Sequence, residues 1–214
     1  PESEEDTTED SGNGEEGLEL GQEELTVPYV AWARETISTH LLAALLEDVG
    51  YTVDVKQVEA GPMFASVADG SADFHTSAWF PATHASYWEQ YQDDLVRVNQ
   101  GLDQAPLALT VPSYMEDVFF LIPAPWSLPI ISQSPLSPFS VFSFKSSIEL
   151  EEYGLDSWEV VSSSESAMLT ELQQAVENEE PIIVPLWKPH WIFGVIDLKM
   201  LEDPKEIYGG AGDQ

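Results

Sequence analysis

Residues 25–60 decide the fold, and they read LTVPYVAWARETISTHLLAALLEDVGYTVDVKQVEA. Residues 25–32 are mostly apolar and favour a strand, and residues 51–60 alternate between apolar and polar side chains as a half-buried strand does. Between them, residues 35–50 have the apolar spacing of an amphipathic helix, which Gly50 ends. This order predicts an α/β fold with a mainly parallel sheet.

The same alternation continues along the chain. The predicted elements that follow are a helix at 61–71, strands at 72–80 and 105–115, helical sequence at 149–180 and a buried strand at 181–187. A serine cluster at 162–164 suits the N-cap of a helix, because serine hydroxyls accept hydrogen bonds from the free N–H groups of a first turn. Ligands of such α/β folds bind beyond the carboxyl ends of the strands.

Three tryptophans stand at the ends of predicted strands. Trp32 ends the first, Trp79 the third, and Trp187 the buried strand at 181–187. We therefore expect Trp32 and Trp79 at the same edge of the sheet, near a ligand. The alternative for each ring is ordinary packing in the core, where large aromatic side chains are usually well buried.

The chain is strongly acidic. Its 214 residues carry 7 Lys and Arg against 39 Asp and Glu, a formal net charge of −32. Nucleic acids and anionic membrane surfaces are not expected as partners, because binding to either one relies on clustered basic side chains. Repulsion within the chain should be severe in dilute buffer, whereas at about 1 M salt the Debye length falls to about 3 Å. We interpret this surface as an adaptation to high salt.

The first 24 residues differ from the rest of the chain. All their charged side chains are acidic, with Ser, Thr and Gly between them, so we expect residues 1–24 to form a disordered tether and order to begin at Leu25. The sequence contains no cysteine, and its pattern predicts neither a transmembrane run nor a signal peptide within these residues.

A second unusual segment runs from Phe119 to Phe144. It contains no charged residue and is rich in Pro, Ser and Phe. Its apolar period fits neither a helix nor a strand, and its prolines would interrupt both. We interpret residues 119–144 as a stretch translated out of frame or as an insertion.

Several uncommon motifs occur in one order and resemble the OpuAC-type substrate-binding proteins of ABC importers for glycine betaine. The resemblance covers most of residues 27–118 and 149–210. The motifs that carry it are YVAW (29–32), YTVDVKQVEAGPMF (51–64), GSADFHTSAWFPATH (70–84), VPSYM (111–115), EYGLDSW (152–158), SSSESAML (162–169) and PLWKPHWIF (185–193).

The resemblance implies a two-lobed, type II periplasmic-binding-protein fold with a ligand cleft between the lobes. Lobe 1 is then expected at 25–112 and lobe 2 at 113–186, with residues 187–214 returning to lobe 1. An extracytoplasmic location follows, with tethering to the membrane through a segment that precedes the sequence. The implied partner is the permease subunit of the importer, and we expect a monomer.

The resemblance also implies a site. Trp32, Trp79 and Trp187 match the three tryptophans that box a quaternary ammonium group in that family, and His84 matches a histidine that contacts the ligand carboxylate. The family also uses backbone N–H groups of a GIDPG-like turn. This sequence lacks the turn, which should fall within residues 119–144. The remaining tryptophans are interpreted as packing residues: Trp88, Trp126, Trp158 and Trp191.

The chemistry of a betaine suits these residue types. Its methylated cation has no hydrogen-bond donor, so aromatic faces can compete with water, and each cation–π contact contributes about 0.5–2 kcal/mol. Its carboxylate needs donors, and an imidazole N–H is one. Carnitine, proline betaine and choline are alternative ligands, and a sensor domain of the same fold is an alternative to an importer component.

Other classes of function find less support. The four histidines lack the paired spacing of a metal site, so no metal or cofactor is expected. No nucleophile-elbow pattern surrounds the serine cluster at 162–164, which leaves a hydrolase as a remote alternative and favours a protein that is not an enzyme. His190 lies beside the predicted cage and is interpreted as structural.

Overall fold

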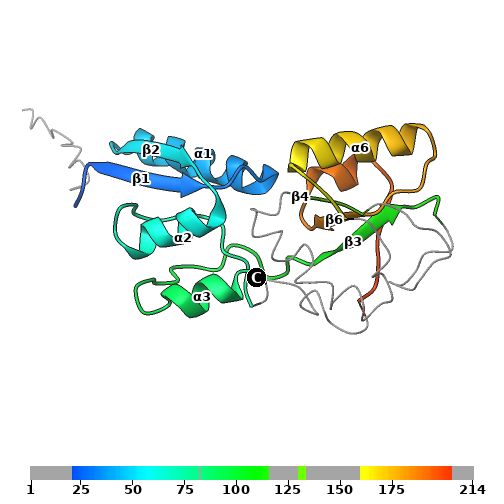
Figure 1. Ribbon diagram of the computed structural model, residues 1–214. Coiled ribbons are helices and arrows are strands. Elements are labelled where there is room, and N and C mark those ends of the chain that lie inside the picture. The colour runs from blue at the N-terminus through cyan, green and yellow to red at the C-terminus, as the bar shows by residue number, and fades with distance from the viewer. Residues whose placement is uncertain (1–20, 82, 116–129, 134–159, 204–214) are drawn as a thin grey trace, which may run out of the picture.

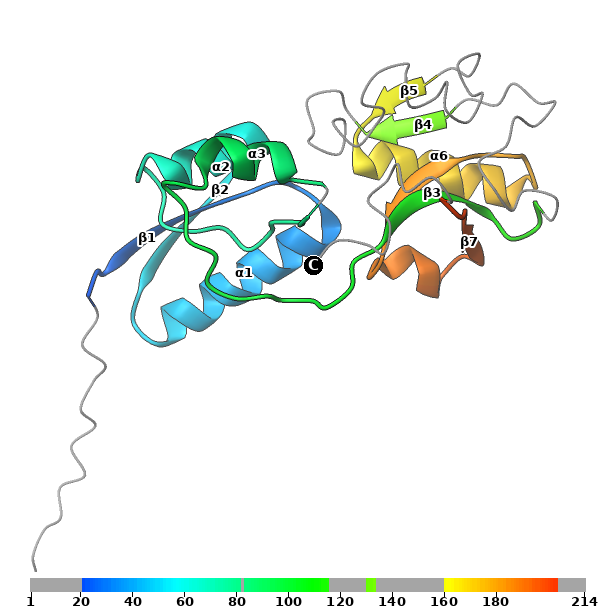
Figure 2. The same ribbon diagram turned by 90° about the horizontal axis from the view of Figure 1, so that it is seen from below.

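The computed structural model describes residues 21–81, 83–115, 130–133 and 160–203 and has two lobes (Figures 1 and 2). The first lobe contains β1 (Glu24–Tyr29), α1 (Ala33–Asp48), β2 (Thr52–Gln57), α2 (Ala60–Ala68) and α3 (Ala85–Tyr91). The second contains β3 (Leu107–Pro112), β4 (Ile130–Gln133), β5 (Val160–Ser163), α6 (Glu165–Glu177), β6 (Val184–Trp187), the 3-10 helix η1 (Trp191–Gly194) and β7 (Leu198–Met200).

The strand–helix–strand unit expected at the start of the chain is present. Strands β1 and β2 pair in parallel, with Val27 opposite Val55, and α1 connects them. The chain leaves α1 through Gly50, whose φ of 108° lies in the region that favours glycine. Local periodicity and one glycine were therefore sufficient to predict this unit.

The prediction of a strand at residues 72–80 is wrong, because these residues form an irregular segment. Only Asp73 bonds to β1 there: its N–H donates to the Thr26 carbonyl at 2.9 Å, and its carboxylate accepts from the Thr26 N–H at 2.7 Å. Further along, the backbone of Trp79 is bonded to His84 instead of to a neighbouring strand. A side chain thus competes for the peptide groups that a sheet would need.

The prediction of a mainly parallel sheet is also wrong for the second lobe. Strands β6, β3 and β7 form an antiparallel sheet in that order, whereas β4 and β5 pair in parallel. Strand β3 falls within residues 25–112, assigned above to the first lobe, yet it pairs with both β6 and β7 in the second lobe (Figure 1). Strand β7, within the segment expected to return to lobe 1, lies in the second lobe too.

Helix α1 turns an unexpected face to the protein. Its buried residues are Glu35, Thr39 and Ala43, which are spaced four apart on one side. Its apolar residues Ile37 and Leu41 are 66% and 59% exposed. The apolar pattern therefore predicted the helix but not its orientation, since the row of Ile37, Leu41 and Leu45 points outward.

Three further predictions can be compared with the described residues: the acidic tether, the unusual segment 119–144 and the serine N-cap. Strand β1 begins at Glu24, within the predicted tether of residues 1–24, whose first 20 residues lie outside the described chain. Within the segment 119–144, residues 130–133 form β4, and the other positions are not among the described residues. The predicted N-cap is confirmed, because the Ser164 hydroxyl accepts from the N–H of Ala167 at the start of α6.

Each lobe contains a buried apolar cluster, and the cluster of the first lobe also includes residues of the second. One cluster packs α6 against β6 and η1 through residues such as Leu172, Val184 and Ile192. The other lies mainly in the first lobe, around Met63 and Phe64 of α2, and it includes all three candidate tryptophans. Among the helices that the structure describes, none is both long enough and apolar enough to cross a bilayer.

Candidate ligand-binding site

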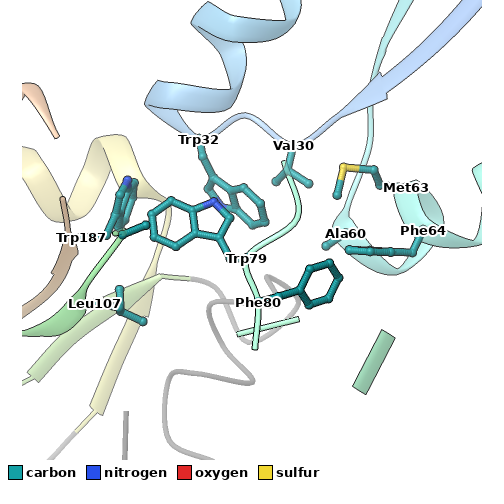
Figure 3. Close-up of a cluster of buried hydrophobic side chains, with 10 residues drawn as sticks. Val30, Trp32, Ala60, Met63, Phe64, Trp79, Phe80, Leu107 and Trp187 are labelled. Atoms are coloured by element: carbon teal, nitrogen blue, oxygen red, sulfur yellow. The ribbon is translucent and has the colours of Figure 1, made fainter. Parts of the chain in front are cut away.

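The three candidate tryptophans lie together (Figure 3). Trp32 immediately precedes α1, and Trp79 lies in the irregular segment before α3, so both belong to the first lobe. Trp187 is the last residue of β6 in the second lobe. The three side chains are 4%, 4% and 1% exposed, respectively, so rings from both lobes are buried in one cluster.

Trp79 and Trp187 make one of the contacts between the lobes. Their ring centroids are 6.4 Å apart, and their planes meet at 87°. Both rings occur in a Trp-X-Pro sequence with a cis peptide bond before the proline, at Pro81 and Pro189. This edge-to-face relation is common in aromatic packing, and it is also compatible with two adjacent walls of a box.

Trp32 provides the link to the histidine. It is the N-cap residue of α1, and its carbonyl accepts the first helical hydrogen bond, from the N–H of Thr36 at 2.8 Å. Its ring stacks on the imidazole of His84, with centroids 5.8 Å apart and planes at 21°. The three tryptophans and the histidine predicted from sequence are therefore brought together.

His84 is fully buried and its tautomer is determined by one hydrogen bond. The backbone N–H of Trp79 donates to Nδ1 of His84 at 2.8 Å, so Nδ1 is an acceptor and the proton of a neutral ring is on Nε2. Within the described residues, Nε2 has no hydrogen-bond partner. A buried N–H donor is therefore available beside Trp32, which is the type of group that a carboxylate requires.

Burial keeps this ring neutral. It lowers the pKa of His84 to about 3, and the nearby His75 contributes further to the shift. Burial likewise lowers the pKa of His75 to about 4, although the backbone of Ser77 partly opposes the change. Both histidines are uncharged at neutral pH, so His84 would offer a ligand a dipolar N–H group and not a positive charge.

An acidic side chain is buried in the same lobe. Glu35, in the first turn of α1, is 1% exposed, and burial raises the pKa of its carboxyl well above the usual value. The backbone of Val30, the charge of Arg34 and the hydroxyl of Ser77 partly offset that shift. Sequence reasoning passed over Glu35, because an acidic residue in a first helical turn is ordinarily explained by the helix dipole.

A second acidic residue, Glu165 at the start of α6, connects the lobes. One carboxylate oxygen, Oε2, accepts from the N–H of Ala33 at 3.1 Å, and the other, Oε1, lies 3.2 Å from Nε2 of His190. His190 in turn meets the ring of Trp187 edge-on, with centroids 4.8 Å apart. Sequence reasoning missed Glu165 as well, since no local pattern reveals a contact with a residue 132 positions away.

The site contains few other charged groups that could hold a cofactor. No group of three or more metal-ligating side chains occurs in the parts of the chain that the structure describes. The position expected for the GIDPG-like turn, within residues 119–144, lies outside the described residues apart from β4. The described site is therefore an aromatic cluster beside the neutral imidazole of His84.

The two-lobed α/β architecture is that of the type II periplasmic binding proteins, the class to which its structural neighbours belong. Within that class, the chain belongs to the family of the substrate-binding domain of the ABC-type glycine betaine transport system. The family's sequence model matches residues 23–119 and 142–214. The resemblance drawn from the motifs is thus confirmed, and the match is interrupted inside the segment 119–144.

Known relatives agree with this assignment. The glycine betaine/carnitine transport binding protein GbuC of Listeria monocytogenes serotype 1/2a (strain 10403S) is 36% identical over 96 residues, which cover 45% of this chain and 32% of the relative. The matched residues therefore span about a third of that curated relative.

Two solved structures are similar over most of the chain. Lactococcal OpuAC, closed and complexed with glycine betaine, has a TM-score of 0.80 at 29% identity, with 89% of this chain and 74% of that chain covered. The glycine betaine/L-proline-binding protein ProX of Borrelia burgdorferi has a TM-score of 0.77 at 29% identity, with 89% and 72% covered.

Proposed function

We propose that this protein captures glycine betaine outside the cytoplasm and delivers it to the permease subunit of an ABC importer. The observation that carries the proposal is the meeting of three indoles from two lobes beside a buried imidazole N–H. In this proposal Trp32, Trp79 and Trp187 surround the trimethylammonium group, and His84 donates from Nε2 to the carboxylate. Capture then serves to import a compatible solute under osmotic stress.

The physical argument for the cation is that ring faces replace weakly bound water. A methylated ammonium group has no N–H to satisfy, and tryptophan offers the strongest cation–π face of the aromatic side chains. Three faces can together contribute several kcal/mol. Because ring faces stabilise the cation without an acidic side chain, the site would discriminate against inorganic cations, which carboxylates attract.

The argument for the carboxylate concerns His84. An N–H group that is buried without a partner costs about 1–3 kcal/mol, and a ligand carboxylate would recover that cost. A neutral donor is sufficient, since hydrogen bonds to an ionised acceptor are stronger than those between neutral groups. The relatives named above support this ligand class, as one is complexed with glycine betaine and another is named for glycine betaine and carnitine.

The experiment is a calorimetric titration of the purified protein in molar salt with a panel of small ligands. Glycine betaine should bind saturably. Glycine, which keeps the carboxylate but lacks the methyl groups, and choline, which keeps the methyl groups but lacks the carboxylate, should each bind more weakly. Titrations with carnitine and proline betaine show how broad the range of ligands is. Equal binding of glycine and glycine betaine would contradict the aromatic cage.

The partner and the assembly need a second experiment. We propose that the protein acts as a monomer that docks on a permease, so a chain of this size should sediment as one species with and without ligand. Transport of glycine betaine by membrane vesicles that contain the cognate permease should require the protein. A sensor role would instead give ligand binding without any stimulation of transport.

A further inference from the structure

Glu165 couples the two lobes through its side chain. Its carboxylate accepts hydrogen bonds on both oxygens, from the backbone N–H of Ala33 at 3.1 Å and from His190 at 3.2 Å. Ala33 directly follows Trp32, and the ring of His190 lies against that of Trp187. One carboxylate therefore joins the chain segments that carry two of the three candidate tryptophans, one from each lobe.

The direction of the second hydrogen bond follows from the contact that the other ring nitrogen of His190 makes. Its Nδ1 accepts from the backbone N–H of Ile192 at 3.2 Å, so the proton of a neutral ring is on Nε2 and is donated to Glu165. The His190 side chain is 0% exposed and that of Glu165 is 9% exposed. Both groups facing Glu165 are donors, which is an environment that only a group with two acceptors satisfies.

The helices add an electrostatic reason. Glu165 is the first residue of α6, and Ala33 is the first residue of α1. The N-terminal ends of these two helices face one another where the two lobes meet (Figure 2). Each end carries a partial positive charge from its unpaired N–H groups, so the two ends repel when the lobes close. A carboxylate between them converts that repulsion into attraction.

We propose that Glu165 is a positioning residue that holds the lobes closed over the tryptophan cluster. When the lobes part, the Ala33 N–H loses its acceptor and the two helix ends separate. In this proposal Glu165 acts through Ala33 and His190 and not on the ligand directly. The proposal rests on the proposed function for its ligand, but the contact itself can be measured without any ligand.

Two variants and one matched control test the proposal. Glu165→Ala removes both acceptors. Glu165→Gln keeps the size of the side chain but offers a single acceptor, so it can satisfy either Ala33 or His190 and not both. Glu171→Ala is the control, because it removes an acidic side chain from the exposed face of the same helix.

The affinity for glycine betaine should differ among these variants in a fixed order. Glu165→Ala should lose at least about tenfold in affinity, mainly through faster dissociation, because a charged hydrogen bond that exists only in the closed state is lost. Glu165→Gln should lie between Glu165→Ala and the unmodified protein. Glu171→Ala should bind like the unmodified protein. The same affinity in Glu165→Ala and Glu171→Ala would overturn the proposal.

The ligand-free measurements separate this proposal from the proposed function. Hydrogen exchange of the Ala33 amide should accelerate in Glu165→Ala, while the Thr36 amide, bonded to the Trp32 carbonyl, should keep its rate. The radius of gyration from solution scattering should increase in the same variant and not in Glu171→Ala. If the unmodified protein does not bind betaine, but Glu165→Ala still shows these changes relative to it, the proposed function is wrong and the contact stands. If Glu165→Ala does not fold, the same comparisons with Glu165→Gln decide the outcome.

Discussion

Trp79 and His84 hold each other in place through two hydrogen bonds of opposite direction. The N–H of Trp79 donates to Nδ1 of His84 at 2.8 Å, and the N–H of His84 donates to the carbonyl of Trp79 at 2.9 Å. The indole of Trp79 and the imidazole of His84 are therefore positioned by one turn. Any movement of this turn displaces the candidate cage and the candidate carboxylate donor together.

The first prediction separates the two ends of the ligand. His84→Asn places an amide oxygen near the position of Nδ1, where it can still accept from Trp79, but it removes the Nε2 donor. We expect this variant to bind glycine betaine about tenfold more weakly, since about 1–1.5 kcal/mol of hydrogen bonding to the carboxylate is lost. Binding of choline, which has no carboxylate, should not change. An equal loss for both ligands in titration calorimetry would contradict the role of His84.

The second prediction concerns the cage. Trp32→Ala, Trp79→Ala and Trp187→Ala should each weaken binding of glycine betaine by about 1–3 kcal/mol, through lost cation–π energy and lost packing. Trp191→Ala is the control, because Trp191 is 50% exposed and lies outside the buried cluster. Affinities from calorimetry at molar salt provide the check. Three variants that bind like the control would show that the indoles are packing residues.

The third prediction concerns pH and stability. The pKa of His84 is about 3 in the folded protein and about 6.5 when the chain unfolds. Below pH 6.5 the unfolded chain therefore binds a proton that the folded protein does not, so stability decreases as the pH falls. This single group should cost about 2 kcal/mol between pH 7 and pH 5.

The measurement is a comparison of two denaturation series. Glu35 acts in the opposite direction, since its raised pKa lets the folded protein bind a proton first, and His75 acts in the same direction as His84. Both contributions cancel in the difference between the unmodified protein and His84→Asn. That difference should shrink as the pH falls from 7 to 5. A difference that is constant over this range would contradict the burial of a neutral His84.

The fourth prediction concerns salt. With a net charge of −32, the folded chain repels itself in dilute buffer, and screening should raise its thermal midpoint strongly toward molar salt. A neutral osmolyte at matched osmolality is the control, as it does not screen charge. A midpoint that stays flat or falls with potassium chloride would refute adaptation to high salt.

The fifth prediction concerns residues 119–144, where the match to the family is interrupted. Replacing them with a family-like segment that contains the GIDPG turn should supply further N–H donors for the ligand carboxylate. Affinity for glycine betaine should therefore increase, and solubility should improve because an uncharged, apolar stretch is removed. Calorimetry on the two versions side by side provides the check. Equal, tight binding by both would mean that the natural segment is a functional variant.

Sequence reasoning succeeded where structure depends on near neighbours. Alternation in residues 51–60 predicted β2, Gly50 predicted the end of α1, and Ser164 predicted the start of α6. Each signal acts within one or two turns of the chain. Family motifs then identified which tryptophans meet, a relation that periodicity alone does not encode.

The failures share a physical origin in contacts that are remote or made by side chains. Residues 72–80 have the composition of a strand, yet His84 takes the peptide group of Trp79. The apolar spacing of α1 predicts a helix but does not say which face the sheet will cover. Glu165 matches the preference for acidic residues in a first helical turn, so its reach to Ala33 remains hidden until the lobes are seen together.

The perpendicular pair of Trp79 and Trp187 has a spectroscopic consequence. Their indoles are 6.4 Å apart and come from different lobes, so their electronic transitions couple only while the lobes are closed. Separation of the lobes removes that coupling and exposes both rings to water, which changes the near-ultraviolet circular dichroism. The protein therefore carries a built-in optical reporter of its own closure, and no external label is needed to follow it in real time.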